Sequence, residues 1–139
     1  MRLEEFRIKH STLIENYQFI EQHLKGIYAA ISGNEFLSAL EDVELSNVRK
    51  LVVEIQEIEN HDNITVIPVE VYNRIEESRL RRNYWCHSCY FDMAFKPNGD
   101  PKNEKDINIL KRDLREAEEL REILFQIEQS FLYNYRANI

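Results

Sequence analysis

The sequence is poor in the residues that interrupt regular backbone structure, with only three glycines and three prolines among 139 residues. Such a composition favours a few long elements over many short ones, because glycine and proline mark most turns. Cysteine is also scarce: two residues, three positions apart, exclude the disulfide framework of a small secreted scaffold. The apolar stretches GIYAAI and ITVIPV are short, and neither approaches the ~18 residues of a membrane-spanning helix.

Positive charge is in deficit as well, with 18 Lys and Arg against 25 Asp and Glu and a net charge of −7. This balance argues against a protein that coats nucleic acid through its overall field, so any contact with phosphate must be local. The first ten residues, MRLEEFRIKH, mix acids and bases where a secretory signal needs an apolar core. We therefore expect a cytoplasmic protein, without a membrane partner, whose thiols stay reduced.

Apolar residues recur every three or four positions, the spacing of helices with one buried face. The first such stretch predicts a helix over residues 3–32. Gly33 and Asn34 predict its end, since both tolerate left-handed backbone. A short helix is expected next, bending into a longer one that begins at a cap at Ser46 and reaches Ile58.

The second half of the sequence predicts two further helices. Residues 60–63 predict a turn, and a brief extended segment leads to Pro68, which is well placed as the first residue of a helix reaching about Phe95. PNGDP would close that helix, and the last helix is expected over residues 107–131. The pattern predicts an all-α bundle of four or five helices in which the whole chain, residues 1–139, forms one domain.

The segment RRNYWCHSCYF, residues 81–91, falls inside the third of these long helices. A helix turns about 100° per residue, so Arg79, Asn83 and His87 form a stripe with Arg82 beside it. Four arginines lie within nine residues of an acidic chain, which makes this segment a candidate phosphate site. They are Arg74, Arg79, Arg81 and Arg82.

Three of these side chains form a minimal set for cleaving RNA by its own 2′-hydroxyl. His87 can move protons near neutral pH, as no other unperturbed side chain can. The Arg82 guanidinium can face two oxygens of the phosphorus centre as negative charge gathers there. Asn83 can hold a ring or a phosphate in place. The scheme needs no metal and no cofactor.

The run Arg82-Asn83-Tyr84-Trp85-Cys86-His87 has the form Arg-x4-His with asparagine after the arginine. It resembles the signature of HEPN domains (higher eukaryotes and prokaryotes nucleotide-binding). The resemblance implies a helical bundle, and a metal-independent endoribonuclease of a toxin–antitoxin or phage-defence system. It also implies a homodimer whose two motifs share one cleft, and an antitoxin partner.

The sequence departs from that family in one respect. Many HEPN toxins that pair with a nucleotidyltransferase antitoxin carry a tyrosine two residues after the histidine. Cys89 stands there in this chain, and Tyr90 follows it. The missing tyrosine and the net acidity favour an alternative: a catalytically inactive helical module that binds a nucleotide or a partner protein in the same pocket.

Other residues of the segment are candidates for RNA contact. Arg79 and Arg81 could bind phosphate, although each could equally pair with a nearby glutamate. Tyr84 and Tyr90 could stack on bases, although aromatic rings more often form core or dimer contacts. Trp85 lies roughly opposite the stripe and is expected to be buried.

The spacing Cys86-His87-x-Cys89 also invites comparison with zinc sites, whose usual ligands are thiolate and imidazole. Adjacent residues on a helix point about 100° apart, so Cys86 and His87 would not readily bind one ion. We interpret the two cysteines instead as small buried apolar residues.

Overall fold

The computed structural model describes residues 2–87, 89 and 104–137, and describes residues 104–106 and 135–137 by their backbone alone. This part of the chain is all-α, which confirms the predicted bundle of four or five helices. The expected helix end near Phe95, the PNGDP break and Tyr90 lie outside the described residues. The helices are α1 (Leu3–Ile31), α2 (Phe36–Asp42), α3 (Val48–Asp62), α4 (Val69–His87) and α6 (Glu104–Ala137).

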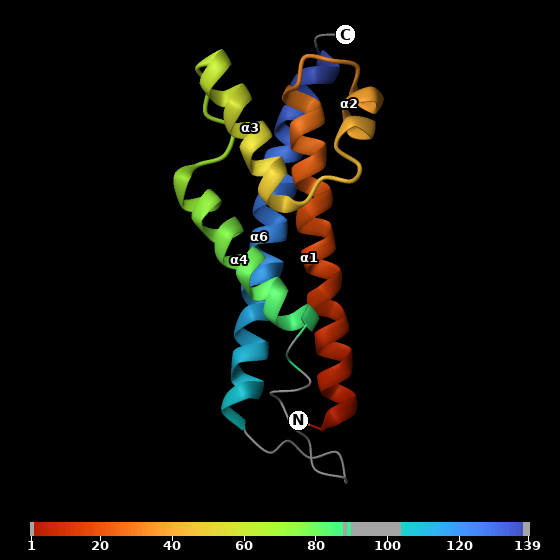
Figure 1. Cartoon of the computed structure of the whole chain (residues 1–139), viewed down its shortest axis with the longest axis vertical. Helices are drawn as coiled ribbons and strands as arrows, with labels where there is room; N and C mark the ends of the chain where they lie inside the picture. Colours follow the sequence, from red (N-terminus) through yellow and green to blue (C-terminus); the bar gives the residue numbers. More distant parts are fainter. Residues whose placement is uncertain (1, 88, 90–103, 138–139) are drawn as a thin grey trace.

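The two longest helices, α1 and α6, run side by side in the same direction (Figure 1). The Arg121 side chain donates a hydrogen bond to Asn16, and His23 is hydrogen-bonded to Glu128. Both pairs are 105 residues apart, as expected for parallel helices in a fixed register. Helix α2 lies against the C-terminal part of α1, and α3 and α4 cross the opposite side of the α1–α6 pair. Helix α4 runs back toward the end of the bundle where α6 begins.

The first helix boundaries follow local backbone chemistry. Helix α1 ends at Ile31, and Gly33 has φ 78°, the left-handed geometry expected for it. The cap predicted at Ser46 is wrong by one residue. The side chain of Asn47 accepts from the Lys50 amide at 2.9 Å and caps α3, whereas Ser46 is buried. Both are good capping residues, and the packing of the preceding loop decides between them.

The α3–α4 connection is shorter than expected. The predicted turn at residues 60–63 is mostly helix, because α3 continues to Asp62 and only Asn63, at φ 52°, leaves the helical region. Helix α4 begins at Val69, directly after Pro68, whose carbonyl accepts two hydrogen bonds from the first turn. The last helix extends beyond its predicted range at both ends, from Glu104 to Ala137.

One partly buried carboxylate holds this connection in place. Glu59 accepts from the amides of Val66 and Ile67 at 2.8 and 3.0 Å, and the Tyr72 hydroxyl donates to it. Burial, and then the bond to Glu59, raises the pKa of Tyr72 above its usual value. The start of α4 is therefore fixed to the end of α3.

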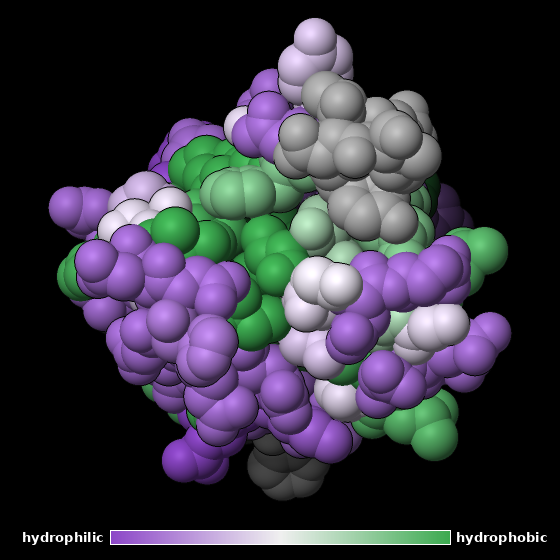
Figure 2. All heavy atoms as spheres, turned by 90° about the horizontal axis from the view of Figure 1, so that it is seen from above, coloured by the Kyte–Doolittle hydropathy of each residue, from purple (hydrophilic) through white to green (hydrophobic). Residues whose placement is uncertain are grey.

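The hydrophobic core lies mainly between α1 and α6 and is closed on one side by α3 and α4. Seen along the bundle from the end where the C-terminus lies, hydrophobic side chains show between hydrophilic surfaces (Figure 2). Trp85 is 1% exposed, which confirms its predicted burial, and its Nε1 donates to Asp113 of α6 at 2.8 Å. Within the described residues, no helix is long and apolar enough to cross a membrane.

Candidate functional site

A groove of about 550 Å³ opens between α1, α3 and α4. Helix α4 supplies most of its wall, the first turn of α3 supplies a second side, and α1 contributes one side chain. The residues that line it are Glu21, Asn47, Val48, Arg49, Arg79, Arg82, Asn83, Cys86 and His87.

The groove brings together the three residues that were predicted from the sequence to be catalytic. Arg82, Asn83 and His87 all line it, because four-residue and five-residue spacings keep them on one half of α4. Asn83 and His87 are exposed to solvent, and the Arg82 side chain is 33% exposed. A ligand entering the groove can therefore reach a guanidinium, an amide and an imidazole together.

Arg79 lines the same groove but is already paired. Its Nε and Nη2 donate to Glu76 at 2.9 and 2.6 Å, the fork geometry of a bidentate ion pair. This bond raises the pKa of Arg79 and lowers that of Glu76. The local pairing considered from the sequence is thus present, and a phosphate must compete with Glu76 for this arginine.

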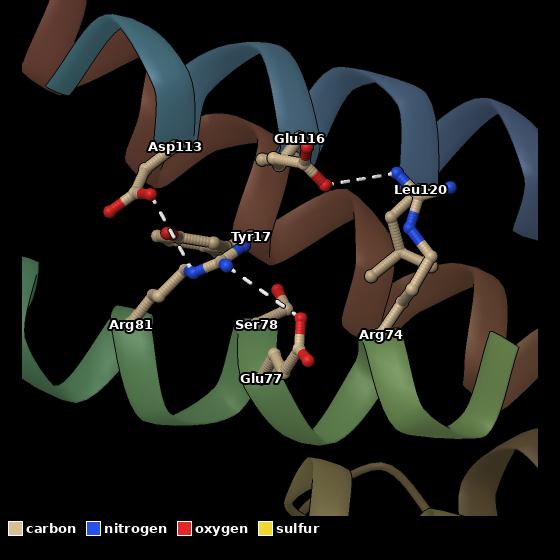
Figure 3. A pocket seen from close by; sticks show the side chains of 9 residues that line it. Tyr17, Arg74, Glu77, Ser78, Arg81, Asp113, Glu116 and Leu120 are labelled. Carbon is tan, nitrogen blue, oxygen red and sulfur yellow. Dashed lines mark hydrogen bonds and ion pairs between the residues drawn. The ribbon is translucent and has the colours of Figure 1, made fainter. Parts of the chain in front are cut away.

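Arg81 does not reach the groove. It points toward α6, where its Nε lies 3.6 Å from Asp113, and its Nη2 lies 3.6 Å from Glu77 of its own helix (Figure 3). Tyr17 of α1 lies beside this pair in a small cavity of about 10 Å³. Burial, with the nearby Asp113 charge, raises the pKa of Tyr17. Arg81 therefore joins α4 to α6 and is not placed to bind the same phosphate as Arg82.

Of the two aromatic candidates, Tyr84 lies away from the groove wall. Tyr84 is partly buried against the core, with its ring 5.0 Å from that of Trp85 in an edge-on contact. Tyr84 is not among the residues that line the groove. Tyr90 is outside the described residues, so its predicted base contact stays a prediction.

The two cysteines occupy different environments. Cys89 is buried, with Sγ 3.3 Å from the Trp85 carbonyl and 3.5 Å from His10 Nε2. Cys86 is exposed and lines the groove, so the prediction that it is buried was wrong. Cys86 lies on the solvent-facing side of α4 with Arg82 and His87, whereas Trp85 is buried in the core. In the described part of the chain, no three His, Cys, Asp or Glu side chains are grouped to hold a metal ion.

Sequence reasoning missed two charged residues of the groove, Arg49 and Glu21. One signal could have identified Arg49. The first turn of α3 contains no acidic residue and instead carries Arg49 and Lys50, although the helix dipole favours acids there. A basic pair at a helix N-terminus concentrates positive potential, and here that potential faces the groove. Glu21 carries no comparable local signal, since α1 contains many acidic residues.

Comparison with protein-family models, with curated proteins and with solved structures finds no match to this chain.

Proposed function

We propose that the protein is a metal-independent endoribonuclease that cleaves RNA by attack of the 2′-hydroxyl on the adjacent phosphate. One observation carries the proposal: Arg82, Asn83 and His87 line one solvent-open groove together with Arg49 from another helix. The groove combines anion-binding groups with a proton-transfer group, which is the combination this reaction needs.

Each group has a role that its chemistry supports. Arg82 and Arg49 stabilise the negative charge that gathers on the non-bridging oxygens, aided by the positive end of the α3 dipole. Asn83 orients the phosphate or the imidazole. His87 exchanges a proton with a reacting oxygen, and the products are a 2′,3′-cyclic phosphate and a 5′-hydroxyl.

The wider setting belongs to the same proposal and rests on the resemblance to HEPN domains. It comprises a cytoplasmic toxin or phage-defence role, a homodimer that places two grooves near one another, and an antitoxin that restrains them. Light scattering of the purified protein tests the dimer directly, because a monomer at working concentration contradicts it.

The central experiment compares His87→Ala with the wild type on labelled RNA in EDTA. General acid–base catalysis contributes about 10²–10⁴-fold, so we expect a loss of that size and cyclic phosphate ends in the wild-type products. His61→Ala is the matched control, since the His61 side chain is 89% exposed and lies at the far end of α3. Equal cleavage by His87→Ala and the wild type, or none by either, contradicts the proposal.

One observation favours the alternative of a binding module without turnover. Two groove arginines already face carboxylates, Arg79 at Glu76 and Arg82 at Glu21, so an anion could bind by exchanging partners and go no further. Calorimetry with a nuclease-resistant oligonucleotide, run beside the cleavage assay, separates the two functions. Binding that depends on Arg82, with no product formed, favours the module.

A further inference from the structure

Among the described residues that line the groove, Glu21 is the one carboxylate. It comes from α1, and its side chain is only 18% exposed. Its Oε1 lies 3.9 Å from Arg82 Nη1. At this distance the two groups form an ion pair but not a hydrogen bond. Neither group uses its hydrogen-bonding capacity on the other, so both can bond a ligand.

A carboxylate at this position works against phosphate binding. It lies within a groove that would otherwise attract an anion, and like charges in a partly buried site repel more strongly than at an open surface. The repulsion between this carboxylate and a bound phosphate is explained if the carboxylate takes part in the reaction.

The proposed reaction needs two proton transfers, one from the attacking 2′-hydroxyl and one to the departing 5′-oxygen. His87 alone cannot accept and donate in the same step. We infer that Glu21 is the general base and His87 the general acid, so that both proton-transfer groups come from one chain. This inference rests on the proposed endoribonuclease function and adds a second catalytic residue to it.

The step balances as follows. Glu21 accepts the 2′-hydroxyl proton while the 2′-oxygen bonds to phosphorus. The bond from phosphorus to the 5′-oxygen breaks, and protonated His87 gives its proton to that oxygen. Glu21 is left protonated and His87 neutral, and exchange with water restores both groups. Arg82, beside Glu21, holds the phosphate between them.

The decisive variant is Glu21→Gln, which keeps the size of the side chain and removes its basicity. We expect kcat to fall about 10²–10⁴-fold, while the affinity for a nuclease-resistant oligonucleotide rises because a repelling charge is gone. Glu21→Asp retains a carboxylate and should recover part of the rate. Glu15→Gln is the matched control, since Glu15 is an exposed glutamate of the same helix.

The pH profile distinguishes a base from a residue that only positions Arg82. With a carboxylate base and an imidazolium acid, kcat/KM rises and then falls with pH, and Glu21→Gln abolishes the rising limb. A purely positioning role lowers the whole profile without changing its shape. The charged and titratable groups that share the groove with Glu21, and must be considered in any fit, are Arg49, Arg79, Arg82, Cys86 and His87.

The possible results separate this inference from the proposed function. If His87→Ala is inactive but Glu21→Gln retains wild-type kcat and profile, the inference fails and the endoribonuclease proposal stands. If the wild type cleaves no RNA, both fail. Co-purified mixtures of the Glu21→Gln and His87→Ala chains should stay inactive, because neither chain holds both groups; recovered activity would place the pair on two chains and overturn the single-chain site.

Discussion

The contact between Trp85 and Asp113 anchors the part of α4 that carries the groove, and removing Asp113 tests that role. Trp85 stands between Arg82 and His87 in the sequence, and its Nε1 donates to the Asp113 carboxylate at 2.8 Å. Both residues are buried, at 1% and 3% exposure. Asp113→Ala leaves a buried indole donor without its acceptor.

The expected cost follows from these contacts. Removing the charged acceptor of this hydrogen bond costs about 1.5–3 kcal/mol, because the buried Trp85 donor is left unsatisfied. Arg81 and Arg112 also lose their ion pairs with Asp113, but Arg81 keeps Glu77. We expect the free energy of unfolding to fall by about 2–4 kcal/mol, or roughly 10 °C in Tm.

Urea unfolding followed by fluorescence measures this cost, because Trp85 is the sole tryptophan and reports on its own environment. Glu118→Ala is the control, an exposed glutamate on the same helix. A double-mutant cycle with Trp85→Phe, followed by far-UV circular dichroism because this variant has no tryptophan, should return a coupling of about 1.5 kcal/mol or more. If the free energy of unfolding of Asp113→Ala lies within about 0.5 kcal/mol of the wild-type value and the Trp85 emission is unchanged, the proposed role of this contact is refuted.

Three further changes test other parts of the structure. Tyr17→Phe should not lower the free energy of unfolding, and should raise it by up to about 1 kcal/mol, because in the described part of the chain the buried Tyr17 hydroxyl has no hydrogen-bond partner; a clear loss in urea unfolding would contradict this. The pKa of Tyr72 is raised in the fold, so its contribution to stability is fully present below about pH 10 and is lost as pH rises further. Tyr72→Phe should lower the free energy of unfolding at pH 7 but flatten its decline above about pH 10. Glu76→Gln should free Arg79 for phosphate, tightening oligonucleotide binding and steepening its salt dependence by about one ion, and an unchanged slope would show that Arg79 does not reach the ligand.

The local elements could be predicted from the sequence because their causes are local. Apolar periodicity and Gly33 define α1, and the breaks around Pro68 separate α3 from α4. The choice between Ser46 and Asn47 as a cap could not be made this way, since either residue can accept the bond and tertiary packing buries Ser46. The parallel direction of α1 and α6 depends on pairs 105 residues apart, which no local pattern encodes.

The groove was partly predictable for the same reason. The stripe of Arg82, Asn83 and His87 follows from helical spacing alone. The rotation of α4 about its own axis depends on the contact of Trp85 with Asp113 of α6. The same rotation directs Arg81 toward α6 instead of toward the groove. Arg49 and Glu21 come from other helices and enter the site only through packing.

The parallel course of α1 and α6 has a mechanical consequence. The start of α1 and the end of α6 lie at opposite ends of the bundle, so a force that pulls these two points apart acts along both helix axes and slides one helix past the other. Hydrogen bonds between the two helices, such as Asn16–Arg121 and His23–Glu128, would then bear the force at the same time instead of breaking one after another. A molecule stretched between its ends should therefore yield in one abrupt event.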